Sequence, residues 1–110
     1  MEITETILQD INHLKTRAGM HFIDDKSYYA MKTFITGYIS GLCFSANKNF
    51  FSHLNRWQNA KYKKTGNIIW TELIPYMNKD KTDEELRLTL LSNLEEYFIK
   101  NPNWQNIVEE

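Results

Sequence analysis

Apolar side chains recur at helical spacing along most of the chain. The first series comprises Ile3, Ile7, Ile11 and Leu14. Its spacing of i, i+4, i+8 and i+11 places these residues on one face of a helix. We therefore expect a first helix over residues 3–16, ended at Ala18-Gly19, because glycine adopts the left-handed conformation of a helix C-terminus at little cost.

The strongest helical pattern comes next. It comprises Met31, Phe34, Ile35, Tyr38, Ile39 and Leu42. Asp25 or Ser27 is available as its N-cap, since a short polar side chain can accept a bond from the first free amides. Gly37 and Gly41 lie one turn apart in this helix, where each costs about 1 kcal/mol relative to alanine. We expect another helix to approach closely there, because glycine has no side chain to hold two backbones apart.

A third amphipathic pattern follows after a short polar break. Its apolar residues are Phe50, Phe51, Leu54 and Trp57. We expect this helix to begin at Asn47 or Lys48 and to end near Lys64, with residues 65–67 forming a turn. Leu54 and Trp57 are expected to face inward, so that the basic side chains of the helix lie on its solvated side.

The next apolar run, residues 68–71, is too short to distinguish a helix from a strand. We favour a short helix that is capped by Asn67 and disrupted by Pro75, whose ring clashes with an upstream carbonyl group. The strand remains the alternative at this point of the chain.

The last long helix has the clearest start signal. Thr82 and Glu85 match a capping box, in which each side chain bonds the backbone amide of the other residue. The apolar face then comprises Leu86, Leu90, Leu91, Leu94, Tyr97 and Phe98. The helix is expected to reach Lys100 and to stop before Pro102. A final turn that packs back on the body is expected at Trp104, Ile107 and Val108.

No segment alternates as a half-buried strand does, and no hairpin signal is present. The expected fold is therefore all-α: one compact domain of five to six helices over residues 1–110. The net charge of −1 gives no general attraction to nucleic acid or to an anionic membrane. No apolar run approaches about 18 residues, so we expect no membrane span. The first ten residues carry acids and no basic group, unlike a signal peptide, so the expected location is the cytoplasm.

The sequence offers little catalytic chemistry. His13, His21 and His53 are far apart, and only His21 lies near carboxylates, at Asp24 and Asp25. Cys43, the only cysteine, sits on an apolar helical face, where burial raises the pKa of a thiol and makes it inert. We therefore predict no catalytic residue, no metal and no cofactor. An enzyme built around Cys43 or His21 is one remaining hypothesis. It requires that either residue lie in an open pocket beside a polar side chain.

Charge is unevenly distributed along the chain. Residues 45–66 carry only basic charges, whereas residues 71–110 carry nine acids and four bases. The basic run includes Arg56, Lys61, Lys63 and Lys64. Together with Trp57 and Tyr62, these residues give the mixture of cations and aromatic rings that binds RNA or single-stranded DNA. A small nucleic-acid-binding or regulatory helical module is thus one hypothesis for the function.

Two stretches, "LKTRAGMHF" and "MKTFITGYISGL", resemble a pattern found in a set of small bacterial proteins. In that set an Arg-Pro-Gly-Met-Tyr step precedes a helix with Phe-x-x-Gly-Tyr. The matching positions are Arg17, Gly19, Met20, Phe34, Gly37, Tyr38 and Trp70; Ala18 and His21 depart from the pattern. The step also has a structural explanation, in which Gly19 ends the first helix and Met20 and Phe22 enter the core.

Proteins of this size and style resemble the immunity proteins encoded beside polymorphic or contact-dependent inhibition toxins. That resemblance implies a protein that is not an enzyme, binds a cognate toxin domain in the cytoplasm and blocks its active site. A nuclease site is basic, so an inhibitor gains from carboxylates. The expected partner-binding acids are Asp24, Asp25, Asp80, Asp83 and Glu84. The expected exposed aromatic anchors are Tyr28, Tyr29 and Tyr76.

Overall fold

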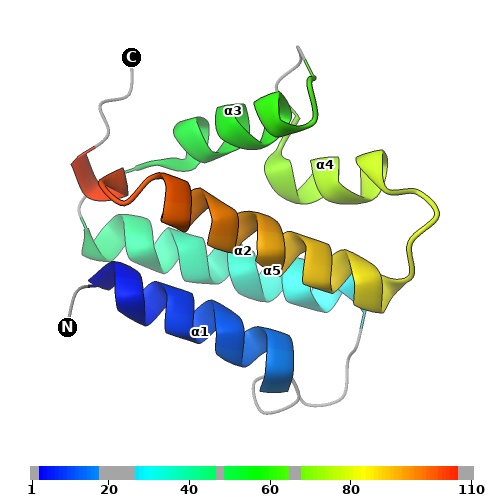
Figure 1. Ribbon diagram of the computed structural model, residues 1–110, viewed down its shortest axis with the longest axis horizontal. Helices are drawn as coiled ribbons and strands as arrows, with labels where there is room; N and C mark the ends of the chain where they lie inside the picture. The colour runs from blue at the N-terminus through cyan, green and yellow to red at the C-terminus, as the bar shows by residue number, and fades with distance from the viewer. Residues whose placement is uncertain (1–2, 18–26, 47–48, 65–67, 107–110) are drawn as a thin grey trace.

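Five α-helices follow one another along the described part of the chain (Figure 1). The computed structural model describes residues 3–17, 27–46, 49–64 and 68–106, and within these ranges the chain forms no strand. The helices are α1 (Ile3–Arg17), α2 (Tyr28–Ser45), α3 (Phe51–Lys61), α4 (Trp70–Met77) and α5 (Asp83–Lys100), followed by a 3₁₀ turn, η2 (Trp104–Asn106). This all-α globule confirms the predicted fold class.

Helix α5 organises the packing of the others. It packs against α1, α2, α3 and α4, and α3 also packs against α4. Figure 1 shows α1 along one side of α5 and the α3–α4 pair along the other, with α2 on its far face. The resulting body is flattened, with extents of 37 × 36 × 20 Å.

Aromatic side chains fill one end of the core. Phe50 and Trp104 have ring centroids 5.0 Å apart, and Phe98 and Trp104 have centroids 5.5 Å apart with nearly perpendicular rings. Such edge-to-face pairs contribute about 1 kcal/mol beyond the burial of their area. Trp104 is fully buried, and its Nε1 donates to Thr4 Oγ1 on α1 at 3.1 Å. The prediction that Trp104 packs back on the body is confirmed; Ile107 and Val108 lie outside the described residues.

The predicted polar caps of α2 and α5 are confirmed. Ser27, one of two candidates, caps α2: its Oγ accepts from the amide of Ala30 at 3.1 Å. Thr82 and Glu85 form the capping box of α5, with bonds of 3.2 Å and 2.9 Å. Three acids in the first turn of α5 add a favourable interaction with the helix dipole.

Helix α3 is shorter than expected at both ends. It begins at Phe51, not at Asn47 or Lys48, which lie outside the described residues. It ends at Lys61 because the chain then turns out of the helix: Lys63 has a φ of 58°, and its amide donates to the carbonyl of Ala60. The expected end near Lys64 was therefore wrong by one turn.

Residues 68–71 do not form a strand; α4 begins at Trp70. Its N-cap is Ile69, not Asn67, and Ile69 has no side chain with which to cap. Asn55 of α3 supplies the missing group, because its Oδ1 accepts from the amide of Trp70 at 2.9 Å. Pro75 does not disrupt the helix, which continues to Met77. The effect of Pro75 is limited because the carbonyl of Thr71, which Pro75 cannot bond, accepts a hydrogen bond from the Tyr28 side chain of α2.

Within the described chain, no helix packs closely against the α2 glycines, so the expected close approach is wrong for an internal helix. Gly37 and Gly41 are exposed, and a Cβ atom built on either meets no atom within 4 Å in the described part of the chain. Both glycines lie on the outer face of α2, which also carries Phe44, with 89% of its surface exposed.

Candidate binding surfaces

Two exposed tyrosines lie on α2 and α4, and an ion pair joins these two helices. Tyr29 at the start of α2 is 70% exposed, and Tyr76 near the end of α4 is 48% exposed. Lys32 Nζ lies 5.8 Å from the centre of the Tyr29 ring and forms an ion pair with Glu72. Glu72 lies one turn before Tyr76 on α4. We call Tyr29, Lys32, Glu72 and Tyr76 the tyrosine surface.

Two lysine side chains lie close to the ring of Tyr76. Lys64 Nζ lies 4.8 Å and Lys79 Nζ 5.1 Å from its centroid. These distances permit cation–π attraction, which is worth about 0.5–1 kcal/mol at an exposed site. Ile69, the N-cap of α4, and Met77, its last residue, are also exposed, at 60% and 37%. This helix therefore presents an aromatic ring and two apolar side chains to solvent.

Tyr28 is not the exposed anchor that the sequence suggested. It is only 8% exposed, and its hydroxyl donates to the carbonyl oxygen of Thr71 at 2.6 Å. Burial raises the pKa of Tyr28, and the nearby charge of Glu72 raises it further. The ring is part of the joint between α2 and α4, so Tyr28 cannot act as a surface contact.

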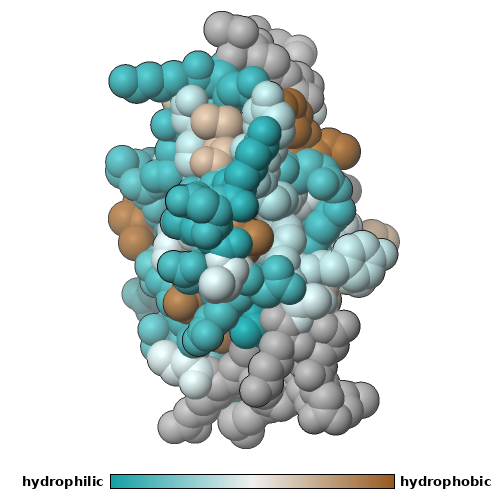
Figure 2. Space-filling model, turned by 90° about the vertical axis from the view of Figure 1, so that its right-hand side faces the viewer, coloured by the Kyte–Doolittle hydropathy of each residue, from teal (hydrophilic) through white to brown (hydrophobic). Residues whose placement is uncertain are grey.

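The described acids predicted to bind a partner lie around the start of α5. Asp80 is exposed in the α4–α5 connection, and Glu84 is exposed beside Arg87. Asp83 is exposed too, but its Oδ2 also accepts from the backbone amide of Tyr28 at 3.3 Å. Figure 2, which views the molecule from the side of this connection, shows a mostly hydrophilic face with a few isolated hydrophobic residues. Asp24 and Asp25 lie outside the described residues.

The predicted basic set is partly engaged within the protein. Lys61 Nζ lies 2.7 Å from Glu96 Oε1, and Lys64 covers Tyr76. Lys61 holds the pKa of the Glu96 carboxyl below its usual range. Arg56 and Lys63 are exposed. These four residues therefore do not form one uninterrupted cationic surface.

Of the two residues expected to face inward from α3, one does so fully. Leu54 is buried. Trp57 is half-buried, with its ring centroid 5.6 Å from that of Tyr97 on α5. The exposed part of the Trp57 ring lines a shallow groove with Lys61, Glu96 and Lys100.

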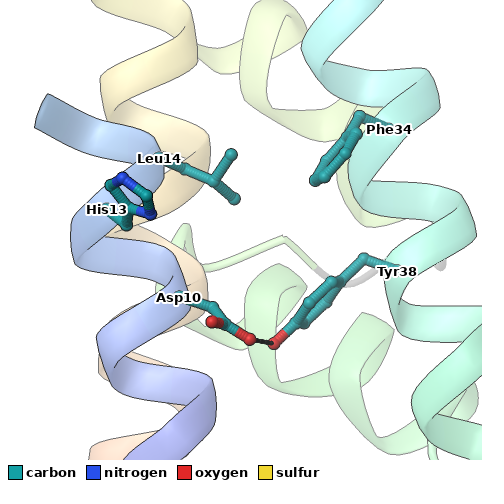
Figure 3. A pocket seen from close by; sticks show the side chains of 5 residues that line it. All are labelled: Asp10, His13, Leu14, Phe34 and Tyr38. Atoms are coloured by element: carbon teal, nitrogen blue, oxygen red, sulfur yellow. Dashed lines mark hydrogen bonds between the residues drawn. The ribbon is translucent and has the colours of Figure 1, made fainter. Parts of the chain in front are cut away.

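A pocket between α1 and α2 was not anticipated from the sequence (Figure 3). It has a volume of about 150 Å³ and is lined by Asp10, His13, Leu14, Phe34 and Tyr38. Helical spacing places the first three on one face of α1 and the last two on one face of α2. Sequence spacing could identify each face but not their juxtaposition, which arises because both helices pack on α5. We call this cavity the α1–α2 pocket.

A hydrogen bond closes one side of this pocket. The hydroxyl of Tyr38 donates to Asp10 Oδ2 at 2.7 Å. Burial raises the pKa of Tyr38, and the Asp10 carboxylate raises it further because it accepts this bond. Among the described residues, no lysine, arginine or histidine forms an ion pair with Asp10. The Asp10 carboxylate thus has no cationic ion-pair partner among the described side chains.

Of the residues considered for catalysis, the structure describes Cys43. Cys43 is half-buried; burial raises the pKa of its thiol, whereas a hydrogen bond with the Phe50 backbone lowers it. His21 lies outside the described residues. In the described ranges no three His, Cys, Asp or Glu side chains gather in a way that could hold a metal ion. None of the helices in those ranges is long and apolar enough to cross a membrane.

The residues that carry the resemblance to immunity proteins have different environments. Phe34 and Tyr38 line the α1–α2 pocket, and Trp70 is buried. Gly19 and Met20 lie outside the described residues. The prediction that Gly19 ends the first helix and that Met20 and Phe22 enter the core therefore stays a prediction. Comparison with known proteins finds no matching family, no matching curated protein and no matching solved structure.

Proposed function

We propose that the protein acts by binding another protein, as an immunity protein that occludes the active site of a cognate bacterial toxin, in the cytoplasm. The observation that carries the proposal is the tyrosine surface, where Tyr29 and Tyr76 are exposed at adjoining elements. Tyrosine is enriched among the residues that dominate binding energy, because its rigid ring covers a large area at a small cost in entropy. Two such rings supply the anchors of a protein interface.

Carboxylates around the start of α5 favour a basic partner. Asp83 contacts the backbone of Tyr28, the residue next to Tyr29, and Asp80 and Glu84 lie close to it in sequence. A toxin that cleaves nucleic acid has a basic active site, so these carboxylates would accelerate encounter and orient the complex. The lysines near the rings limit this effect, and we therefore assign most of the affinity to the tyrosines.

Binding also accounts for the chemistry of the described residues better than catalysis does. The thiol of Cys43 has a pKa raised by burial, which reduces the fraction of reactive thiolate. Tyr38, which lines the α1–α2 pocket, is held as a phenol by its bond to Asp10. Neither group has the activation that a nucleophile in catalysis requires.

Co-expression with the product of the gene immediately upstream tests this proposal. Affinity capture of the tagged chain is expected to recover that protein in a stable complex. The double variant Tyr29→Ala/Tyr76→Ala is expected to weaken the complex by at least about 30-fold, since a hot-spot tyrosine contributes about 2 kcal/mol or more. The control is Phe44→Ala, which removes a still more exposed ring at the other end of α2. Equal losses in both variants, or no complex with the wild-type chain, would refute the proposal.

The alternative, a nucleic-acid-binding or regulatory module, has weaker support. Arg56 and Lys63 are exposed on or just after α3, but Lys61 is paired with Glu96. A salt-dependent gel shift with RNA or single-stranded DNA would favour this alternative, provided that Arg56→Glu and Lys63→Glu abolish the shift. No shift at low salt would exclude it.

A further inference from the structure

The α1–α2 pocket combines two apolar walls with one polar side. Leu14 and Phe34 face each other across the cavity, and the Asp10–Tyr38 hydrogen bond bridges the two helices beside them (Figure 3). Its volume of about 150 Å³ is smaller than the roughly 300–1,000 Å³ of sites for drug-sized ligands. The space suits a single side chain rather than a cofactor.

The charge of the pocket selects the kind of side chain. Asp10 accepts from the neutral hydroxyl of Tyr38, and no described cationic side chain balances its charge. A carboxylate pairs most strongly with a guanidinium group, which can offer it two parallel N–H donors. The ring of Phe34 adds a surface on which a planar guanidinium can stack.

We propose that the α1–α2 pocket receives an arginine side chain from a partner protein, with Asp10 binding the guanidinium and Phe34 and Leu14 packing against its stem and plane. This inference rests on the proposed function only for the source of the arginine. A basic toxin surface is rich in such side chains, so the pocket would add a second point of contact, distinct from the tyrosine surface. Tyr38 positions the Asp10 carboxylate through its hydroxyl and does not itself bind the guanidinium.

The test uses the isolated protein and needs no partner. N-acetylarginine methylamide is titrated into the ¹⁵N-labelled chain, and backbone amide shifts are followed by NMR. Saturable shifts are expected at residues of α1 and α2 that line the pocket. The citrulline analogue has nearly the same shape without the charge, and is expected to bind at least about tenfold more weakly, as charge-assisted pairs are stronger than neutral ones. The lysine analogue distinguishes recognition of the guanidinium from recognition of any cation.

Matched variants assign the effect to one carboxylate. Asp10→Asn is expected to weaken binding of the arginine probe about tenfold, whereas Glu5→Gln, which removes an exposed charge elsewhere on α1, is expected to leave it unchanged. An unperturbed amide spectrum of each free variant shows that it is folded. Equal binding of the citrulline analogue, or equal effects of the two variants, would overturn the inference. Because the probe replaces the partner, such a failure would leave the proposal for the tyrosine surface intact.

Discussion

The hydroxyl of Tyr28 takes the place of the backbone amide that Pro75 lacks. In a regular α-helix the amide of residue 75 would donate to the carbonyl of residue 71, but proline has no N–H. The Thr71 carbonyl instead accepts from the Tyr28 hydroxyl at 2.6 Å. This hydrogen bond lets α4 continue through Pro75 and joins α4 to Tyr28, the first residue of α2.

Tyr28→Phe is therefore expected to destabilise the fold. The variant keeps the buried ring but leaves the Thr71 carbonyl without its donor, and an unsatisfied buried acceptor costs about 1–3 kcal/mol. Urea denaturation measures the change in the free energy of unfolding. Tyr29→Phe is the control, because its ring is 70% exposed and its change should stay within about 0.5 kcal/mol. An unchanged stability of Tyr28→Phe would show that the bond contributes nothing.

Lys63→Gly is expected to stabilise the protein. Lys63 has a φ of 58°, and its amide and that of Lys64 donate to the carbonyls of Ala60 and Asn59 at 3.0 and 2.9 Å. This arrangement is a Schellman motif, whose left-handed position is normally glycine because a Cβ atom there costs about 1 kcal/mol. Glycine should recover somewhat less than 1 kcal/mol after its larger unfolded-state entropy is subtracted. Lys63→Ala removes the same charge but keeps the Cβ atom, so it should show no such gain in thermal unfolding.

Gln58→Met is also expected to stabilise the protein. The side chain of Gln58 is fully buried on α3, and neither Nε2 nor Oε1 has a hydrogen-bond partner in the described part of the chain. Burying an unpaired amide costs about 1–3 kcal/mol, and methionine has a similar shape without polar atoms. Gln9→Met on the exposed side of α1 serves as the control for the change in composition. A loss of stability in Gln58→Met alone would show that the amide is satisfied in solution, for instance by a buried water.

Local signals in the sequence were sufficient to predict most of the helices. The Thr82–Glu85 capping box and the Ser27 cap act between residues three apart, so their chemistry is visible in the sequence itself. The same holds for the apolar stripes that pack on α5. The end of α3 and the start of α4 were less predictable, because Asn55 caps Trp70 from 15 residues away and Lys63 occupies a position where glycine would have given the signal.

The candidate sites depended on contacts that no local pattern encodes. Tyr28 and Tyr29 are adjacent and chemically alike, yet one is buried against Thr71 and the other is exposed. Asp10 and Tyr38 are 28 residues apart, and they meet only because α1 and α2 both pack on α5. Residue type and spacing named the candidates for binding, but tertiary packing decided which of them face solvent or a cavity.

The pairing of Glu96 with Lys61 predicts an acid-dependent contribution to stability. The ion pair holds the pKa of Glu96 below its usual value, so the unfolded chain takes up this proton at a higher pH than the folded chain does. The contribution is therefore complete above the unfolded pKa, about 4.3, and is lost as the pH falls through the lower folded value. Glu96→Gln should reduce the difference in unfolding free energy between pH 6 and pH 3, as measured by urea denaturation at each pH. Glu5→Gln, an exposed acid of α1, gives the comparison. If Glu96→Gln loses as much stability on acidification as the wild-type chain, the ion pair does not contribute to the pH dependence of folding.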